Sequence, residues 1–462
     1  MSESRQNDGW FVLAFVIGVF ALILGVVGIA LAYHTTPNEA VAANGTGGSG
    51  GVTEFTVTLA DISMSPSSVD VAAGKQITVH VHNNGAMQHD FKVGGAVGIA
   101  LLDPGKSADV VIGPFTADAV AWCTVAGHKA AGMQLALHVV GGTSTASGGA
   151  NLAAPTTVAD NSAHLDATAM PSTDWMPRDP VLPAKAAGVV HEVKMDVIER
   201  VMEVAPGVKQ LMWTFNGTVP GPVLHGSVGD TFKITLTNKG TMGHSIDFHA
   251  SKVAWNDKMR TIKPGESLEY DFTADYAGAF MYHCGTAPAL HHIGNGMYGA
   301  IIIDPPSLAP VDKEFVVLQS ELYFGPQGQP GDLTKMMNEQ VDAVVFNGYV
   351  NQYKFHPIHV EKNRRYRVWV VDDGPNENSA FHIVGTIFDT VFKEGSYTLQ
   401  PDTSHGGSQV LDLQPAQGGF VEFTFAEDGL YPFVTHKFAN PGKGALGFFA
   451  VGAVDTSALG GH

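Results

Sequence analysis

Residues 229–244 read GDTFKITLTNKGTMGH, and they overlay without a gap on residues 74–89, GKQITVHVHNNGAMQH. Both stretches alternate apolar and polar residues with period two before a turn that contains Asn and Gly, which predicts a β-strand followed by a turn. The overlay pairs Asn83 with Asn238, Gly85 with Gly240, Met87 with Met242 and His89 with His244. The chain therefore holds a β repeat, and both copies end on a histidine.

A third and looser copy lies further along the chain. Residues 346–348 repeat the Phe-Asn-Gly of residues 215–217, and the alternating run 366–371 leads to His382. Three such units in tandem predict an all-β protein built from three sandwiches of short strands with Greek-key connections.

Length and composition agree with several domains. The chain has 462 residues, which is too long for one hydrophobic core, and its formal net charge of -18 argues against nucleic acid or anionic lipid as a partner. Stretches rich in Gly, Ser, Ala and Thr separate the units. The predicted segments are a tail and transmembrane anchor at 1–33, a linker at 34–52, a first sandwich at 53–140, a poorly packed linker at 141–172, a second sandwich at 173–306, and a third sandwich with its tail at 307–462.

Residues 10–33 form an uncharged run. A helix of that length would span about 36 Å, enough to cross the hydrocarbon core of a membrane. Residues 30–32 and 40–42 resemble small-residue cleavage sites, so a cleaved signal peptide is the alternative. Because the run is longer than a usual signal core, we expect an uncleaved anchor, with the rest of the chain outside the cytoplasm in either case.

Two sets of four residues have the composition of a blue-copper site. Each set holds two His, one Cys and one Met, and a weak thioether beside imidazole and thiolate is typical of copper electron-transfer centres. The sets are His89, Cys123, His128 and Met133, then His244, Cys284, His292 and Met297. We choose His292 over His291 because it stands five residues before its Met, as His128 does. Both cysteines of the chain are used in these sets, so no disulfide is expected.

A second kind of metal site is predicted on the other side of Cys284. Adjacent residues on a strand face opposite ways, so His283 points away from Cys284, and Asp247 and His249 share the face opposite to His244. His249 and His283 can thus meet at one metal with Asp247 beside it. Three imidazoles with an open position are a common catalytic arrangement. Either His382 or His436 of the third unit can supply the third imidazole, and the other can serve in proton transfer.

Four further histidines lack a metal motif. His80 and His82 overlay on outward strand positions and are expected to be exposed, and His356 and His359 are left unassigned.

From about residue 173 to 453 the chain resembles copper-containing nitrite reductases. The resemblance rests on residues 214–222 (TFNGTVPGP), on 244–249 (HSIDFH), on 282–284 (YHC) through His292 to Met297, and on 295–299 (NGMYG). Residues 53–140 resemble a separate small blue-copper protein, a cupredoxin, fused ahead of the enzyme. The resemblance implies three tandem cupredoxin-like Greek-key β-sandwiches preceded by one transmembrane helix.

The resemblance also implies roles for individual residues. It implies a homotrimer with two type 1 coppers and one type 2 copper per chain, in which His249 and His283 of one subunit and His436 of its neighbour hold the type 2 copper. Asp247 resembles the family's catalytic aspartate and His382 its catalytic histidine. Gly243 stands where many relatives have Pro, and Val384 where many have Ile, although neither removes a ligand.

The implied activity is the one-electron reduction of nitrite to nitric oxide and water, as in denitrification. The implied electron donor is a c-type cytochrome or another cupredoxin, and the implied location is the periplasm or outer face of the membrane. A multicopper oxidase that reduces O2 is the nearest rival, but its copper cluster needs several His-x-His pairs and His-Cys-His, whereas Gly285 follows Cys284. A membrane-tethered electron carrier without activity is the other rival, and the presence of Asp247, His249 and His283 disfavours it.

Overall fold

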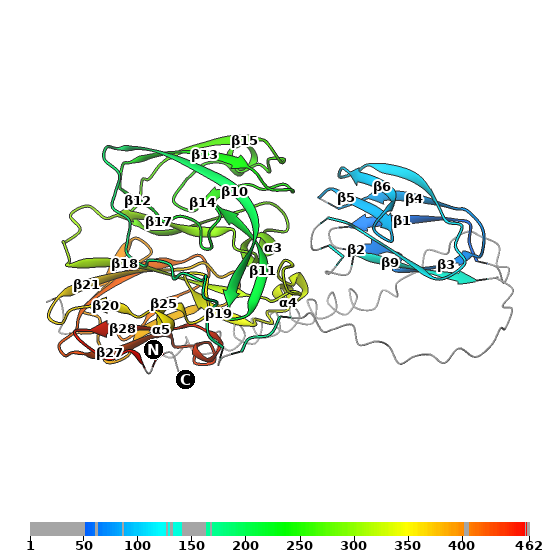
Figure 1. Cartoon of the computed structure of the whole chain (residues 1–462). Helices are drawn as coiled ribbons and strands as arrows, with labels where there is room; N and C mark the ends of the chain where they lie inside the picture. Colours follow the sequence, from blue (N-terminus) through cyan, green and yellow to red (C-terminus); the bar gives the residue numbers. More distant parts are fainter. Residues whose placement is uncertain are drawn as a thin grey trace, which may run out of the picture.

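The structure is a computed structural model of the chain. It describes residues 51–459 apart from 61–62, 86, 126–127, 130–132, 141–162, 167–168, 402–405 and 458. The described chain is built mainly of β-strands, and its six sheets form three two-sheet sandwiches (Figure 1), which confirms the predicted all-β architecture. The anchor predicted at 10–33 lies outside the described residues. None of the helices in the described part of the chain is both long and apolar enough to cross a membrane.

The N-terminal sandwich, blue to cyan in Figure 1, has a four-stranded and a five-stranded sheet. The first sheet has the order β2 (Ser63–Ser65), β1 (Glu54–Ala60), β4 (Ile77–Asn83) and β7 (Ser107–Ile112). The second has the order β3 (Ser68–Ala72), β9 (Gln134–Val140), β8 (Ala119–Trp122), β5 (His89–Val93) and β6 (Val97–Leu102). Its core is made only of its own residues, among them Val57, Val79 and Leu135.

The second sandwich repeats this plan with two four-stranded sheets. One has the order β11 (Val208–Phe215), β10 (Val190–Ala205), β13 (Thr231–Asn238) and β15 (Ser267–Thr273). The other has the order β12 (Leu224–Ser227), β17 (Tyr298–Asp304), β16 (Gly278–His283) and β14 (Asp247–Phe248). Two short helices, α2 (Trp255–Lys258) and α3 (Ala289–Gly294), lie in its loops.

The third sandwich has a six-stranded and a five-stranded sheet. The first has the order β19 (Ala343–Phe346), β18 (Lys313–Leu322), β21 (Arg365–Asp372), β26 (Gly418–Thr424), β23 (Thr390–Lys393) and β24 (Ser396–Leu399). The second has the order β20 (Ile358–Val360), β28 (Leu446–Val451), β27 (Gly429–Thr435), β22 (Ser379–Ile383) and β25 (Leu411–Leu413). The loops carry α4 (Leu333–Met337), α5 (Gln352–Phe355) and the 3-10 turn η1 (Pro441–Lys443).

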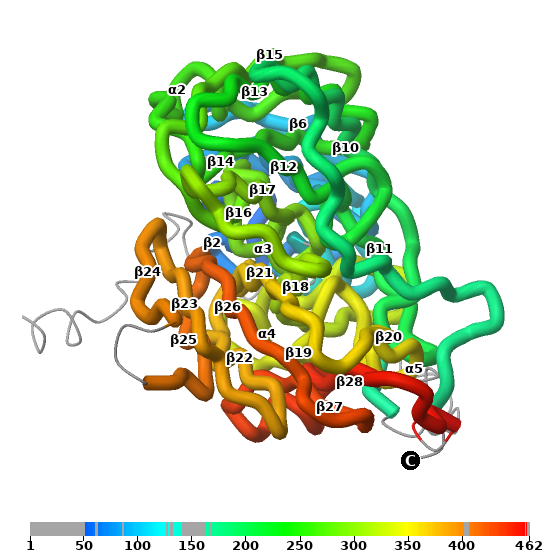
Figure 2. Tube along the Cα trace, turned by 90° about the vertical axis from the view of Figure 1, so that its left-hand side faces the viewer, coloured from blue at the N-terminus to red at the C-terminus, as the bar shows by residue number. Residues whose placement is uncertain are grey.

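The second and third sandwiches share a hydrophobic core. Met212 and Ile302 of the second pack in one cluster with Trp369 and Phe420 of the third, and all four are buried. Figure 2, turned from Figure 1, shows the strands of these two units stacked on one another. Because they share this core, the second and third sandwiches form one rigid unit that supports the loops carrying the candidate site residues.

All three units contain the same strand arrangement. The parallel pairs β1 with β4, β10 with β13, and β18 with β21 each continue into an antiparallel neighbour, which is β7, β15 and β26 respectively. The looser third copy in the sequence is therefore a copy in the fold.

A buried asparagine explains why the first two copies match so closely. Asn83 donates from Nδ2 to the carbonyls of Met87 and Leu102, both at 2.7 Å, and its Oδ1 accepts the N–H of Gly85. Asn238 makes the same three bonds with the carbonyls of Met242 and Ile262 and the N–H of Gly240. Buried backbone groups need partners, so this side chain closes the turn that delivers the following histidine.

The connector before the second sandwich is partly packed. Ala163 lies in the shared core, Ser172 donates its N–H to Glu203, and the Trp175 ring stacks on Tyr349 at 4.2 Å. Ala163 and Ser172 lie within the poorly packed linker predicted for 141–172, but both contact the folded sandwiches.

Candidate metal centres

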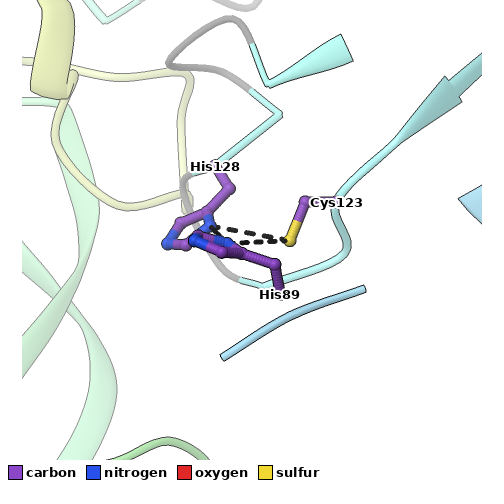
Figure 3. A group of neighbouring side chains, drawn as sticks. All are labelled: His89, Cys123 and His128. Carbon is purple, nitrogen blue, oxygen red and sulfur yellow. Dashed lines mark hydrogen bonds between the residues drawn. The ribbon is translucent and has the colours of Figure 1, made fainter. Parts of the chain in front are cut away.

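The N-terminal sandwich brings His89, Cys123 and His128 together below its surface (Figure 3). The two Nδ1 atoms are 3.2 Å apart, and Cys123 Sγ is 3.9 Å from His89 Nδ1 and 3.5 Å from His128 Nδ1. Met133 is buried beside them: its N–H donates to the His128 carbonyl, and its own carbonyl accepts the N–H of Cys123. The four residues grouped from sequence spacing therefore lie in one place.

The donor triangle fits a metal ion. With edges of 3.2, 3.5 and 3.9 Å, its centre lies about 2.1 Å from each corner, within the usual length of metal–imidazole and metal–thiolate bonds, about 2.0–2.3 Å. Two imidazoles and a thiolate with a methionine nearby are the donor set of blue copper.

A second cluster of the same kind lies in the second sandwich and contains His244, Cys284 and His292. The Nδ1 atoms of His244 and His292 are 3.2 Å apart, and Cys284 Sγ is 3.3 Å from His292 Nδ1. Met297 repeats the bonds of Met133, since its N–H donates to His292 and its carbonyl accepts from Cys284. Burial raises the pKa of the Cys284 thiol, but hydrogen bonds with His244 and backbone N–H groups outweigh it and bring the pKa below its ordinary value.

Glu199 on β10 orients His244, and the sequence reasoning did not find it. His244 Nε2–H donates to Glu199 Oε1 at 3.3 Å, which leaves Nδ1 free to face His292. Burial alone would raise the pKa of Glu199, but hydrogen bonds from His244 and Thr241 lower it to about 2. A carboxylate behind a ligand histidine fixes its tautomer and ring orientation. Glu199 precedes His244 by 45 residues, so no local sequence motif indicates that it contacts this histidine.

The third cluster contains Asp247, His249 and His283 and lies on the other side of the His283-Cys284 peptide bond. Asp247 pairs with His283 across β14 and β16, and the N–H of His249 donates to the Met281 carbonyl. His249 Nε2 and His283 Nε2 are 3.0 Å apart, and Asp247 Oδ2 is 3.9 Å from His283 Nε2. His283 Nδ1–H donates a hydrogen bond to the Cys284 carbonyl, so Nε2 is the His283 nitrogen that is available to a metal ion.

The electrostatics of this cluster favour metal binding. Desolvation, together with the neighbouring His283, lowers the pKa of His249 although the residue is partly exposed, and this favours its neutral imidazole. A neutral imidazole is the form that binds a metal.

His382 and His436 form a separate pair in the third sandwich. Their ring centroids are 5.4 Å apart, and the N–H of His436 donates to Ala380 on the strand that carries His382. His382 Nδ1–H donates to the Gln409 carbonyl at 2.6 Å, which leaves its Nε2 free. Among the described residues of one chain, the group formed by Asp247, His249 and His283 includes neither of them.

The remaining histidines have other surroundings. His80 and His82 are half-exposed on β4, as predicted, and His80 pairs with Glu54 and Asp109. His291, the alternative to His292 in the sequence, is buried, packs against the Trp213 ring and hydrogen-bonds to the Gly331 carbonyl. His356 and His359 line an open cavity of about 360 Å³ and are not part of the metal-like clusters in the described chain.

The buried histidines predict a pH-dependent stability for the copper-free protein. Burial lowers the pKa of His291 to about 4 from the ordinary 6.5, so the unfolded chain binds more protons than the folded one as the pH falls below 6.5. From pH 7 to 5 we expect His291 to cost the folded state about 2 kcal/mol. Urea unfolding of the wild type and of His291→Gln at both pH values measures this, and an equal loss in the two proteins would contradict it.

Comparison with known proteins agrees with this geometry. The profile of a family described as "Multicopper oxidase" matches residues 197–308. A copper-containing nitrite reductase of Neisseria gonorrhoeae is 37% identical over 267 residues, covering 55% of this chain and 67% of the relative. The chain belongs to the copper-containing nitrite reductase family.

Solved structures of family members agree with this assignment. The copper nitrite reductase of Nitrosomonas europaea aligns with a TM-score of 0.52 and 32% identity, covering 58% of this chain and 96% of that one. A copper-containing nitrite reductase of Thermus scotoductus aligns with a TM-score of 0.51 and 29% identity, covering 57% of this chain and 62% of that one. The chain is thus longer than the part that it shares with these relatives.

Proposed function

We propose that the chain reduces nitrite to nitric oxide and water at a type 2 copper held by His249 and His283 of one subunit and His436 of a neighbour. The observation that carries this proposal is that the side chains expected at the catalytic copper lie in two separate groups, and neither group is complete. One sandwich presents two imidazoles and a carboxylate, and the other presents two imidazoles that do not reach them within the described chain. Neither group alone provides the three imidazoles of the proposed site.

Exposed apolar side chains of the third sandwich, which carries His382 and His436, support a contact with a neighbouring subunit. Val384 is 44% exposed, Ile387 62% and Phe438 71%, and the Phe438 ring lies 5.1 Å from that of His436. Large apolar groups clustered at a protein surface mark a contact face. A contact that joins two different surfaces of the chain can close a ring when it repeats around an axis. The resemblance to copper-containing nitrite reductases makes a homotrimer the ring that we propose.

The proposed copper content is two type 1 ions and one type 2 ion per chain. Copper at the third cluster would act as a Lewis acid toward nitrite and as the source of one electron. Cys284 and His283 are adjacent residues in two different clusters, so a few covalent bonds link the blue site to the catalytic one. The reaction consumes one electron and two protons for each nitrite and releases nitric oxide and water.

Asp247 and His382 are the residues that we propose deliver these protons. Asp247 Oδ2 lies beside the two imidazoles, and His382 has a free Nε2 because its Nδ1–H is bonded to a carbonyl. We expect Asp247→Asn and His382→Asn each to lower nitrite turnover by about 10²-fold or more, since positioned proton donors contribute about 10²–10⁴-fold. Copper content and blue colour should be retained. Full turnover in both variants would remove these residues from the mechanism.

The oxidase alternative fits the site less well. Its cluster of three coppers needs many more imidazoles than the described clusters hold. Among the described residues, only one group of three or more His, Cys, Asp or Glu side chains lies outside the two blue sites, and it contains two imidazoles. Two relatives from Neisseria, each matched over about two thirds of its length, are named copper-containing nitrite reductases.

The N-terminal sandwich is the proposed first acceptor of electrons. It carries its own blue-copper donor set and its own core, so it can exchange electrons with an external protein such as a c-type cytochrome or a cupredoxin. The uncharged run at 10–33 is the proposed anchor that would hold the enzyme at the outer, periplasmic face of a membrane.

A further inference from the structure

The two blue-copper clusters differ in the residue that follows their first histidine. It is Asp90 after His89 and Ser245 after His244. Both side chains accept hydrogen bonds from the segment that carries the ligand cysteine. Thr124 donates its N–H to Asp90 Oδ1 at 2.6 Å and its hydroxyl to Oδ2, whereas Gly285 donates its N–H to Ser245 Oγ at 3.0 Å. A carboxylate thus occupies in one site the place that a neutral hydroxyl occupies in the other.

The fold turns Asp90 inward. The register of β5 against β6 shifts between His89 and Phe91, and His89, Asp90 and Phe91 are all buried in succession. On a regular strand Asp90 would face away from His89, so the irregularity re-aims it as β-bulges do beside functional sites. Asp90 is only 4% exposed.

Two other charged groups face these sites. Glu199 lies behind the His244 ring in the second site, where the imidazole separates it from the donor atoms. Lys129 follows His128 in the first site, but it is exposed and its Nζ lies 3.5 Å over the Trp122 ring. Solvent screens an exposed charge far more than a buried one, so the buried Asp90 charge acts on the first site more strongly than the exposed Lys129 charge does.

We propose that Asp90 is a positioning residue that lowers the reduction potential of the N-terminal blue-copper site, so that this site donates its electron to the site at Cys284. A buried negative charge stabilises the oxidised ion, which carries one more positive charge than the reduced ion. Hydrogen bonding and polarity around the thiolate are established determinants of blue-copper potentials. One electron leaves the N-terminal site and reduces the second site, and no proton or bond is exchanged. The inference rests on the proposed function, since both clusters must hold copper.

Redox titration of the blue absorption in the full chain tests this proposal. The substitution Cys284→Ser is introduced first, so that the remaining colour reports on the N-terminal site alone. Asp90→Asn removes the charge and keeps an oxygen acceptor for the Thr124 N–H, and the Thr124 hydroxyl can turn to accept from the new amide N–H. We expect the equilibrium with a one-electron redox dye to shift about tenfold toward the reduced copper, which corresponds to about 59 mV.

The matched control is Asp109→Asn, the same exchange at an exposed position of β7, for which less than a twofold shift is expected. The converse variant, Ser245→Asp in a Cys123→Ser chain, should shift the second site about tenfold toward the oxidised copper. A blue Asp90→Asn protein with an unchanged potential would overturn the proposal. A Cys284→Ser chain that binds no blue copper would overturn the copper assignment itself, and the inference with it.

Discussion

Replacing His249 with alanine is expected to abolish nitrite turnover and to leave both blue centres intact. The His249 Nε2 atom lies 3.0 Å from His283 Nε2, so its loss removes a donor that no other described side chain of the cluster replaces. Loss of a mere partner of a metal ligand costs about 10–100-fold in affinity or activity, and loss of the ligand itself should exceed about 100-fold. The blue sites use other residues, so their absorption should not change.

Anaerobic nitrite assays and copper analysis measure this outcome. His359→Ala is the matched control, because His359 is an exposed histidine on β20 far from the three clusters in sequence. We expect the His249→Ala protein to bind about one copper per chain less than the control. Turnover that persists in His249→Ala would show that the catalytic copper lies elsewhere.

Mixing two inactive variants should restore activity. If each catalytic site combines His249 of one subunit with His436 of the next, a trimer made of His249→Ala and His436→Ala chains has one intact site. Assemblies purified through two different tags should therefore recover about one third of the wild-type activity per trimer. Neither variant alone should be active, because its own trimers contain no intact site.

The control for this experiment is the mixture of His249→Ala and His283→Ala chains. Both changes lie in the same half of the site, so no arrangement of these chains rebuilds a complete site. An inactive mixture of His249→Ala with His436→Ala, in assemblies shown to contain both chains, would contradict a site between subunits.

Much of the fold could be predicted from the sequence because the repeated unit is a strand and a turn that depend mainly on residues close together in the chain. The strand 231–238 and the turn closed by Asn238 are short-range features, and the same alternation and the same Asn bonds recur at 76–83. The predicted separation of Asp247 and His249 from His244 is found in the clusters, although only Asp247–Phe248 of this stretch is a strand.

Other features depend on contacts that no local pattern encodes. Glu199 reaches His244 from a distant strand, and Asp90 is turned inward by an irregularity of β5 that alternation would not predict. The choice between His382 and His436 as ligand stayed open for a similar reason. Both lie at one end of the same sheet with their rings in contact, so their separation in sequence says nothing about which one meets a neighbouring subunit.

Direct detection of nitric oxide from the copper-loaded protein under anaerobic conditions tests the account most directly. Nitrite and a one-electron reductant are supplied, and copper is counted per chain in the same sample. The account predicts nitric oxide release with about three coppers per chain. A blue protein with about two coppers per chain and no nitric oxide would contradict it, because the clusters would then serve only to carry electrons.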